Sequence, residues 1–200
     1  MRLALVDCPA TMRPHAEAVL RGEYALPAGY ALVDVQTVLD LGANVGAFSL
    51  WARTQWPAAE ILAYEPDPAN ARRYETNTGT ACVVAAVTDR PGRARLYAGR
   101  NNCGEASLTP GPEQVAHVSR EVELVDARTL PRADVVKVDT EGEELAILGA
   151  LDLSQTSCVM LEWHSATDRW HIGSMLARLG LDCLVDTRRR ADRGVMVWAR

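Results

Sequence analysis

The chain has 200 residues, of which 48% are hydrophobic, and it carries a formal net charge of −5 at pH 7. This length and composition fit one compact domain with an ordinary buried core. The acidic balance disfavours a nucleic-acid partner, because affinity for phosphates comes mainly from lysine and arginine side chains.

The cysteines and the lengths of the apolar runs indicate where in the cell the protein is expected. The five cysteines are odd in number and form no C-x-x-C pair, which disfavours structural zinc and a disulfide framework. The apolar run at residues 3–6 is too short for a secretory signal, and no run approaches the about 18 residues of a membrane span. We therefore expect a cytoplasmic protein without a membrane partner, and self-association into a homo-oligomer stays open.

The first 36 residues predict a lid or an N-terminal extension. Apolar positions within residues 11–20 indicate a short helix closed by Gly22, and the segment up to residue 36 resembles a loop or short strands. Residues 37–200 are expected to form the main domain. Its first half predicts a βαβαβ unit and hence a parallel sheet, with strands at 38–41, 61–64 and 82–87 and helices at 45–55 and 68–77.

The regular alternation stops at residue 88 and returns near residue 135. Between them, a loop rich in glycine, asparagine and proline precedes an alternating strand at 118–125, so we expect a substrate-side insertion over 99–125. The second half predicts strands at 135–138 and 158–161, helices at 141–151 and 167–179, and a hairpin of strands 182–186 and 195–198. The expected fold is α/β, with a seven-stranded, mostly parallel sheet, helices on both faces and a C-terminal antiparallel hairpin.

The turn after the first strand predicts a nucleotide-like ligand. The sequence D-x-G-x-x-x-G from Asp40 to Gly46 lacks one glycine of the dinucleotide fingerprint, which makes a pyrophosphate ligand less favoured. Glu65, 25 residues after Asp40, ends the second strand and is placed to accept hydrogen bonds from ribose hydroxyls. An acid near a sulfonium and an acid on a ribose together describe S-adenosylmethionine. The glycines could instead merely permit the turn, Glu65 could be an ordinary strand-end acid, and Asp67 is expected to cap a helix.

Two further predicted strands are followed by titratable side chains at the same edge of the sheet. Asp139 and Glu141 follow the fourth strand, and Glu162 and His164 follow the fifth. A capped helix start is the alternative explanation for Asp139 and Glu141. His164 is a candidate general base, because a histidine titrates near neutral pH. The other histidines, His15, His117 and His171, have no such context and are expected at the surface.

Four segments resemble the FkbM-type methyltransferases in order and spacing. They are residues 38–46 (VLDLGANVG), 64–67 (YEPD), 136–142 (VKVDTEG) and 162–164 (EWH). The resemblance implies a class I Rossmann-like methyltransferase fold, S-adenosylmethionine as the methyl donor, and O-methylation of a hydroxyl on a sugar or natural product. It also implies a cofactor site in which residues near Val87 line the adenine, Glu65 holds the ribose and the first turn holds the methionine part. The candidate cofactor-binding residues are therefore Asp40, Gly42, Ala43, Asn44, Gly46, Glu65, Pro66 and Val87.

The expected reaction is an in-line transfer of the methyl group to an acceptor oxygen. His164 or Asp139 is the candidate base, and Glu141 and Glu162 are expected to orient the hydroxylated small-molecule acceptor. An alternative version uses Mg²⁺ held by Asp139, Glu162 and His164 to acidify the hydroxyl. Two other classes also stay open: a nicotinamide-dependent oxidoreductase, and a non-catalytic small-molecule-binding protein of the same fold.

Overall fold

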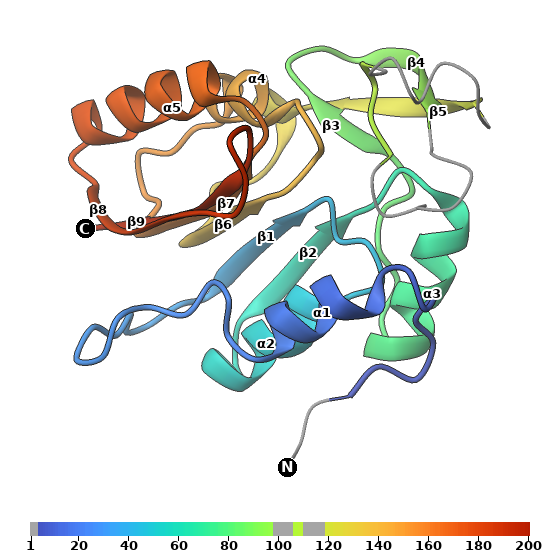
Figure 1. Ribbon diagram of the computed structural model, residues 1–200, viewed down its shortest axis with the longest axis horizontal. Helices are drawn as coiled ribbons and strands as arrows, with labels where there is room; N and C mark the ends of the chain where they lie inside the picture. The colour runs from blue at the N-terminus through green and yellow to red at the C-terminus, as the bar shows by residue number, and fades with distance from the viewer. Residues whose placement is uncertain (1–3, 98–105, 110–118) are drawn as a thin grey trace.

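A computed structural model describes residues 4–97, 106–109 and 119–200 (Figure 1). Its main sheet has six strands in the order β2-β1-β6-β7-β9-β8. Their bounds are Glu60–Tyr64 (β2), Thr37–Leu41 (β1), Val135–Val138 (β6), Cys158–Trp163 (β7), Gly194–Ala199 (β9) and Asp182–Arg188 (β8). The first four are mutually parallel, and β9 runs antiparallel to both β7 and β8. The expected mostly parallel sheet with a C-terminal antiparallel hairpin is therefore confirmed.

The expected seventh strand at 82–87 is not a strand of this sheet. Only Val83 bridges to the edge strand, opposite Tyr64, and the chain then turns away. The expectation assumed that both faces of this run are covered, but Val83 and Val84 are each 48% exposed. Little apolar burial therefore holds the segment against β2, and the strand count was wrong by one.

The segment that leaves the edge joins a second, three-stranded sheet in the order β3-β5-β4. Its strands are Ala86–Thr88 (β3), Ser119–Asp126 (β5) and Gly92–Tyr97 (β4), and a 3₁₀ turn, Ala127–Thr129, follows β5. The alternating pattern of the expected strand at 118–125 is confirmed, since Val122 and Leu124 are buried between exposed neighbours. Much of the expected insertion at 99–125 lies outside the described residues.

Helices cover both faces of the main sheet (Figure 1). On one face lie α1, Arg13–Leu20, and α2, Ala47–Gln55; on the other lie α4, Glu144–Ala150, and α5, Ala166–Arg178. Each pair shares an apolar core with the strands beneath it, and the buried residues of α1 belong to the same core as β1 and α2. Within the described part of the chain, no helix has the length and apolar character needed to cross a bilayer.

Local signals explain where two of the helices begin. Helix α3, Pro68–Thr78, starts after Asp67, whose carboxylate accepts a hydrogen bond from the backbone N–H of Ala69 at 2.7 Å, so the expected cap is confirmed. Helix α4 begins at Glu144, three residues later than expected. The helix begins later because of the backbone conformation before it: Glu141 has a φ of +58° and Gly142 a φ of +120°, and neither value fits an α-helix.

Candidate active site

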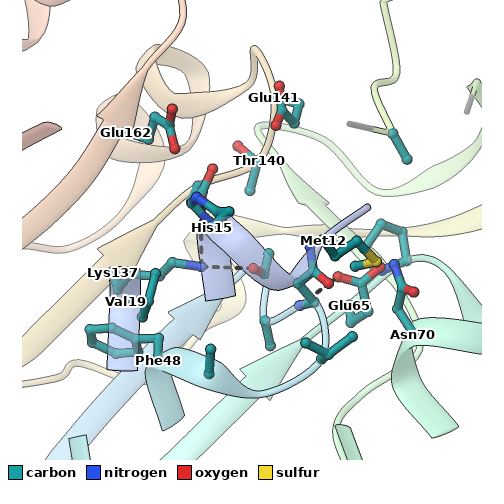
Figure 2. Close-up of a pocket in the computed structure, with 18 of the residues that line it drawn as sticks. Met12, His15, Val19, Phe48, Glu65, Asn70, Lys137, Thr140, Glu141 and Glu162 are labelled. Atoms are coloured by element: carbon teal, nitrogen blue, oxygen red, sulfur yellow. Dashed lines mark hydrogen bonds and ion pairs between the residues drawn. The ribbon is translucent and has the colours of Figure 1, made fainter. Parts of the chain in front are cut away.

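A cavity of about 340 Å³ opens at the carboxyl ends of β1, β2, β6 and β7, with α1 forming one wall. It brings together nine of the predicted site residues: Gly42, Ala43, Asn44, Glu65, Pro66, Val87, Asp139, Glu141 and Glu162. The other three, Asp40, Gly46 and His164, do not line it. In the view of Figure 2, Glu65 and Asn70 lie at one side of the cavity and Glu141 and Glu162 at the other.

The turn after β1 brings backbone close to the neighbouring strand. Gly42 has a φ of +77°, and a Cβ atom at this position would lie 1.8 Å from the carbonyl oxygen of Asp139. A Cβ at Gly46 would lie 2.6 Å from the side chain of Thr78 on α3. Both glycines are therefore required by packing, and Gly42 also lines the cavity through its backbone.

Glu65 is held at the end of β2 by two backbone donors. Its carboxylate accepts hydrogen bonds from the N–H of Asn44 at 2.8 Å and from the N–H of Asp67 at 2.9 Å. Burial raises the pKa of Glu65 to about 7, although both N–H groups favour the charged form. Next to it, the side-chain oxygen of Asn44 is buried with no hydrogen-bond partner among the described residues. This side of the cavity therefore offers acceptors to a ligand that carries hydroxyl or amino groups.

Asp40, a predicted cofactor-binding residue, lies behind the cavity lining. Its side chain is fully buried, accepts a hydrogen bond from the hydroxyl of Ser49 at 2.7 Å and lies 3.2 Å from the ammonium group of Lys137. Lys137 also donates to the carbonyl oxygen of Gly42 at 2.7 Å. Burial disfavours the charged ammonium, but Asp40 and Asp139 outweigh this and raise the pKa of Lys137. The pair is a charged link between β1 and β6 beneath the cavity.

Asp139 is the point where several polar groups meet at the end of β6. The carboxylate oxygen Oδ2 lies 3.6 Å from Nε2 of His15, 3.5 Å from the hydroxyl of Tyr24 and 3.9 Å from Nζ of Lys137. Burial opposes ionisation, but Lys137, His15 and His164 hold the pKa of Asp139 well below its usual range. Asp139 is therefore a carboxylate at neutral pH.

His164 lies between two carboxylates, outside the cavity. Its Nε2 is 3.1 Å from Glu141, and its Nδ1 is 3.2 Å from Glu144. Burial favours the neutral ring, yet the two carboxylates raise the pKa of His164 to about 11. The imidazole is therefore protonated at neutral pH. In this state it has no lone pair with which to accept a proton, contrary to what a general base at this position requires.

His164 contacts the turn that carries Glu141 both directly and through Glu144, which is hydrogen-bonded to the backbone of this turn. A carboxylate oxygen of Glu144 accepts hydrogen bonds from the N–H of Thr140 at 3.0 Å and of Gly142 at 3.1 Å, and the hydroxyl of Ser107 donates to the carbonyl of Glu141 at 2.7 Å. These bonds hold Glu141 in the left-handed region, a costly backbone conformation for a residue with a side chain. The turn thus presents Glu141 to the cavity.

Glu162 at the end of β7 is paired with an arginine of the C-terminal hairpin. Arg189 lies 3.1 Å from the carboxylate of Glu162 and also pairs with Glu23. Burial, with the charge of Asp139 added, raises the pKa of Glu162 to about 7 despite this arginine.

Two groups of three side chains among the described residues have the spacing of metal ligands. They are His15, Asp139 and Glu162, and Asp139, Glu141 and His164. The expected set of Asp139, Glu162 and His164 is not one of them. In both groups a positive charge is already close to a carboxylate: Lys137 to Asp139, and Arg189 to Glu162.

Sequence reasoning missed His15, Tyr24 and Arg189. His15 was expected at the surface, but it points from α1 into the cavity. The only local signal was its position in a short amphipathic helix beside the buried Ala16. Which part of the sheet this helix covers depends on the loop between α1 and β1, and no periodic pattern encodes that path.

A family model for the methyltransferase FkbM domain matches residues 40–183. The methyltransferase sdnD of Sordaria araneosa is 26% identical over 208 aligned positions, which cover 82% of this chain and 80% of sdnD. The hexuronic acid methyltransferase AglP of Haloferax volcanii is also 26% identical, with 80% of this chain and 69% of AglP covered.

A solved structure shares the fold. The crystal structure of methyltransferase FkbM from Methylobacillus flagellatus superposes with a TM-score of 0.55 at 16% sequence identity. The match covers 87% of this chain and 46% of that chain. The expected class I methyltransferase architecture is therefore confirmed, with one strand fewer in the main sheet than expected.

Proposed function

The chain belongs to the FkbM methyltransferase family, and we propose that it transfers a methyl group from S-adenosylmethionine to a hydroxyl oxygen of a sugar or natural-product small molecule. One observation carries this proposal. A single cavity is lined at one side by the buried acceptor Glu65 and at the other by the acidic residues that end β6 and β7. We infer that the donor binds at the first side and the acceptor at the second, so that the cavity brings the two together.

The residues at the Glu65 side fit the proposed donor. Each oxygen of the Glu65 carboxylate accepts one backbone N–H and retains a lone pair for a ribose hydroxyl. The unpartnered side-chain oxygen of Asn44 is suited to an amino donor, and Val87 offers an apolar surface to the adenine. When bound, S-adenosylmethionine supplies a methyl group on a positively charged sulfur. The protein needs no phosphate-binding glycine loop for this ligand, in agreement with the D-x-G-x-x-x-G turn.

The residues at the other side suit an acceptor that carries hydroxyl groups. We assign Glu141 and Glu162 to its orientation, because both line the cavity and can accept hydrogen bonds from hydroxyls. We assign His164 to holding the turn that presents Glu141, since its two ring nitrogens face Glu141 and Glu144. Asp139 is too weak a base to deprotonate a hydroxyl by itself, because its pKa lies well below its usual range.

We propose that the transfer needs no divalent metal. Lys137 and Arg189 already place positive charge beside Asp139 and Glu162, so a cation at these carboxylates would be repelled by both. Treatment with EDTA is therefore expected to leave turnover unchanged. Loss of activity on chelation, restored by Mg²⁺, would contradict a metal-independent transfer.

The experiment that tests the proposed function is a transfer assay with S-adenosylmethionine labelled in its methyl group. The acceptor panel holds neutral sugars, uronic acid glycosides and polyketide-like alcohols; the uronic acids are included because AglP is a hexuronic acid methyltransferase. We expect label in at least one organic product, and loss of that label in Glu65→Ala. Tight donor binding without transfer to any acceptor would contradict the proposal and favour a non-catalytic binding protein.

A further inference from the structure

We propose that His15 takes the proton of the acceptor hydroxyl during methyl transfer and that Asp139 holds its ring in place; this inference rests on the proposed function. His15 lies on α1, outside the 40–183 segment that the family model matches. The residue would therefore be supplied by the N-terminal extension of this chain.

The position of His15 carries the inference. The imidazole lines the cavity, with Nε2 3.6 Å from Oδ2 of Asp139, and its side chain remains 39% exposed. Within the described residues, no hydrogen bond engages its other nitrogen, Nδ1. In the view of Figure 2, His15 lies between Glu65 at one side and Glu162 at the other. One nitrogen thus faces a carboxylate, and among the described residues the other is left without a hydrogen bond.

The other candidate bases around the cavity are already engaged. Both nitrogens of His164 face carboxylates, Glu162 is paired with Arg189, and Lys137 is buried against Asp40. By contrast, His15 combines an unengaged nitrogen with access to the cavity. An imidazole oriented by a carboxylate is a general base suited to neutral pH.

The backbone around His15 gives the ring a fixed position. Helix α1 packs against α2, and its Val19 belongs to the same buried core as Phe48. The segment before it is tied to α3, because Asn77 accepts hydrogen bonds from the backbone N–H groups of Val6 and Asp7, each at 2.8 Å. This fixed position would save the entropic cost of placing a base during the reaction.

The proposed step balances as a displacement. A lone pair of the acceptor oxygen forms the bond to the methyl carbon, and the carbon–sulfur bond breaks with its electron pair passing to sulfur. The sulfonium thereby loses its positive charge. The hydroxyl proton moves to Nδ1 of His15, and the imidazolium formed is stabilised by Asp139 until it releases the proton to water.

The charges around His15 act in opposing directions. Asp139 at the end of β6, Glu162 at the end of β7 and Glu23 beyond α1 favour the protonated ring. Tyr24 and Lys137 lie against Asp139, and Arg189 pairs with Glu162 and Glu23. Burial favours the neutral ring, but the carboxylates outweigh it and raise the pKa of His15 above its ordinary value. We therefore expect the wild-type rate to rise with pH across the neutral range and Asp139→Asn to move this rise to lower pH.

The test compares His15→Gln and His15→Ala with His171→Gln, a matched control on the exposed part of α5. Full-length proteins are assayed with labelled S-adenosylmethionine and an acceptor used by the wild type. Loss of a general base predicts a fall in kcat of about 10²–10⁴-fold for both His15 variants. We also expect unchanged donor affinity by calorimetry, partial rescue of His15→Ala by added imidazole, and wild-type turnover in the control.

A readout independent of activity follows the His15 ring by NMR. The midpoint of its titration should fall in Asp139→Asn, whereas an unchanged midpoint would overturn the role of Asp139. A His15→Gln variant that keeps kcat within threefold of an active wild type would overturn the role of His15 and leave the proposed function intact. A wild type that transfers no methyl group to any acceptor would instead contradict the proposed function itself.

Discussion

Glu65 is buried, yet among the described residues each of its carboxylate oxygens accepts a single hydrogen bond, one from Asn44 and one from Asp67. Ribose hydroxyls can donate to the remaining lone pairs, and they favour the ionised carboxylate. Because burial raises the pKa of Glu65 to about 7, ligand binding must draw the group into its charged form at neutral pH. Under the proposed function, Glu65 would therefore link cofactor affinity to pH.

We predict that affinity for S-adenosylhomocysteine rises about tenfold between pH 6 and pH 8, as Glu65 passes through its pKa of about 7. Glu65→Gln should bind more weakly and lose this part of the pH dependence. Glu162→Gln is the matched control, because Glu162 has a pKa raised to about 7 but lies at the other side of the cavity. Calorimetry across this pH range measures the effect, and an equally steep dependence in Glu65→Gln would refute the assignment.

A second prediction concerns His164, whose ring pairs with Glu141 and Glu144. Its pKa is raised from 6.5 to about 11, so its stabilising effect is complete below pH 6.5 and is lost as pH rises towards 11. His164→Gln should lower the free energy of unfolding by about 3 kcal/mol at pH 6, and by less at pH 9.5. Urea unfolding at both pH values measures this difference. A gap that stays constant or widens with pH would contradict a protonated His164.

At the scale of elements, the junction of β1 and β6 supports the floor of the cavity. Lys137 on β6 neutralises Asp40 on β1 and donates to the carbonyl of Gly42 in the turn that follows. The parallel pairing of the two strands places Lys137 directly opposite Asp40. Thus Asp40, which was predicted to bind the cofactor, forms a buried ion pair with Lys137 beneath the turn.

We predict that Lys137→Met lowers the free energy of unfolding by about 3–5 kcal/mol, because it leaves Asp40 buried without its cation. The control is Arg132→Ala, which removes an exposed ion pair with Asp152 and should change the free energy of unfolding far less, because water screens exposed charges. Chemical denaturation of both variants distinguishes the two cases. Equal losses of stability would show that the Lys137–Asp40 pair stabilises the fold no more than the exposed pair does.

The turn after β1 gives a prediction about close packing. Gly42→Ala should prevent native folding or cost several kcal/mol, because the added Cβ would lie 1.8 Å from the carbonyl oxygen of Asp139. Gly29→Ala is a matched control: Gly29 also has a positive φ, of +88°, but an added Cβ meets no atom within 4 Å. The control should cost only about 1–2 kcal/mol of backbone strain. Thermal unfolding would contradict the packing argument if both variants lost the same stability.

At the scale of the whole molecule, the sequence predicted most of the sheet because its core strands are continuous apolar runs, as in β6 and β7, where burial of both faces is required. It also predicted that Glu65, Asp139, Glu141 and Glu162 meet at one edge, because parallel strands end there. The prediction of a sheet strand at 82–87 was wrong, because an edge segment with exposed valines loses little apolar burial when it leaves the sheet.

The rest of the site depends on contacts between distant segments. His15 reaches Asp139 across 124 positions of the chain, counted from 15 to 139, and only the packing of α1 on α2 brings them together. His164 lies behind the turn of Glu141 because a backbone φ of +58° moves the start of α4 to Glu144. Neither arrangement follows from local periodicity, whereas both decide which side chains face the acceptor.

The proposed reaction transfers the methyl group to oxygen. Incubation of the protein with S-adenosylmethionine carrying a ¹³C-methyl group and an accepted substrate, followed by NMR of the purified product, tests it most directly. We expect a single labelled methyl group bonded to an oxygen of the product, formed by the wild type and lost in Glu65→Ala. A labelled methyl group on nitrogen or carbon, or labelled product formed equally well by Glu65→Ala, would contradict it.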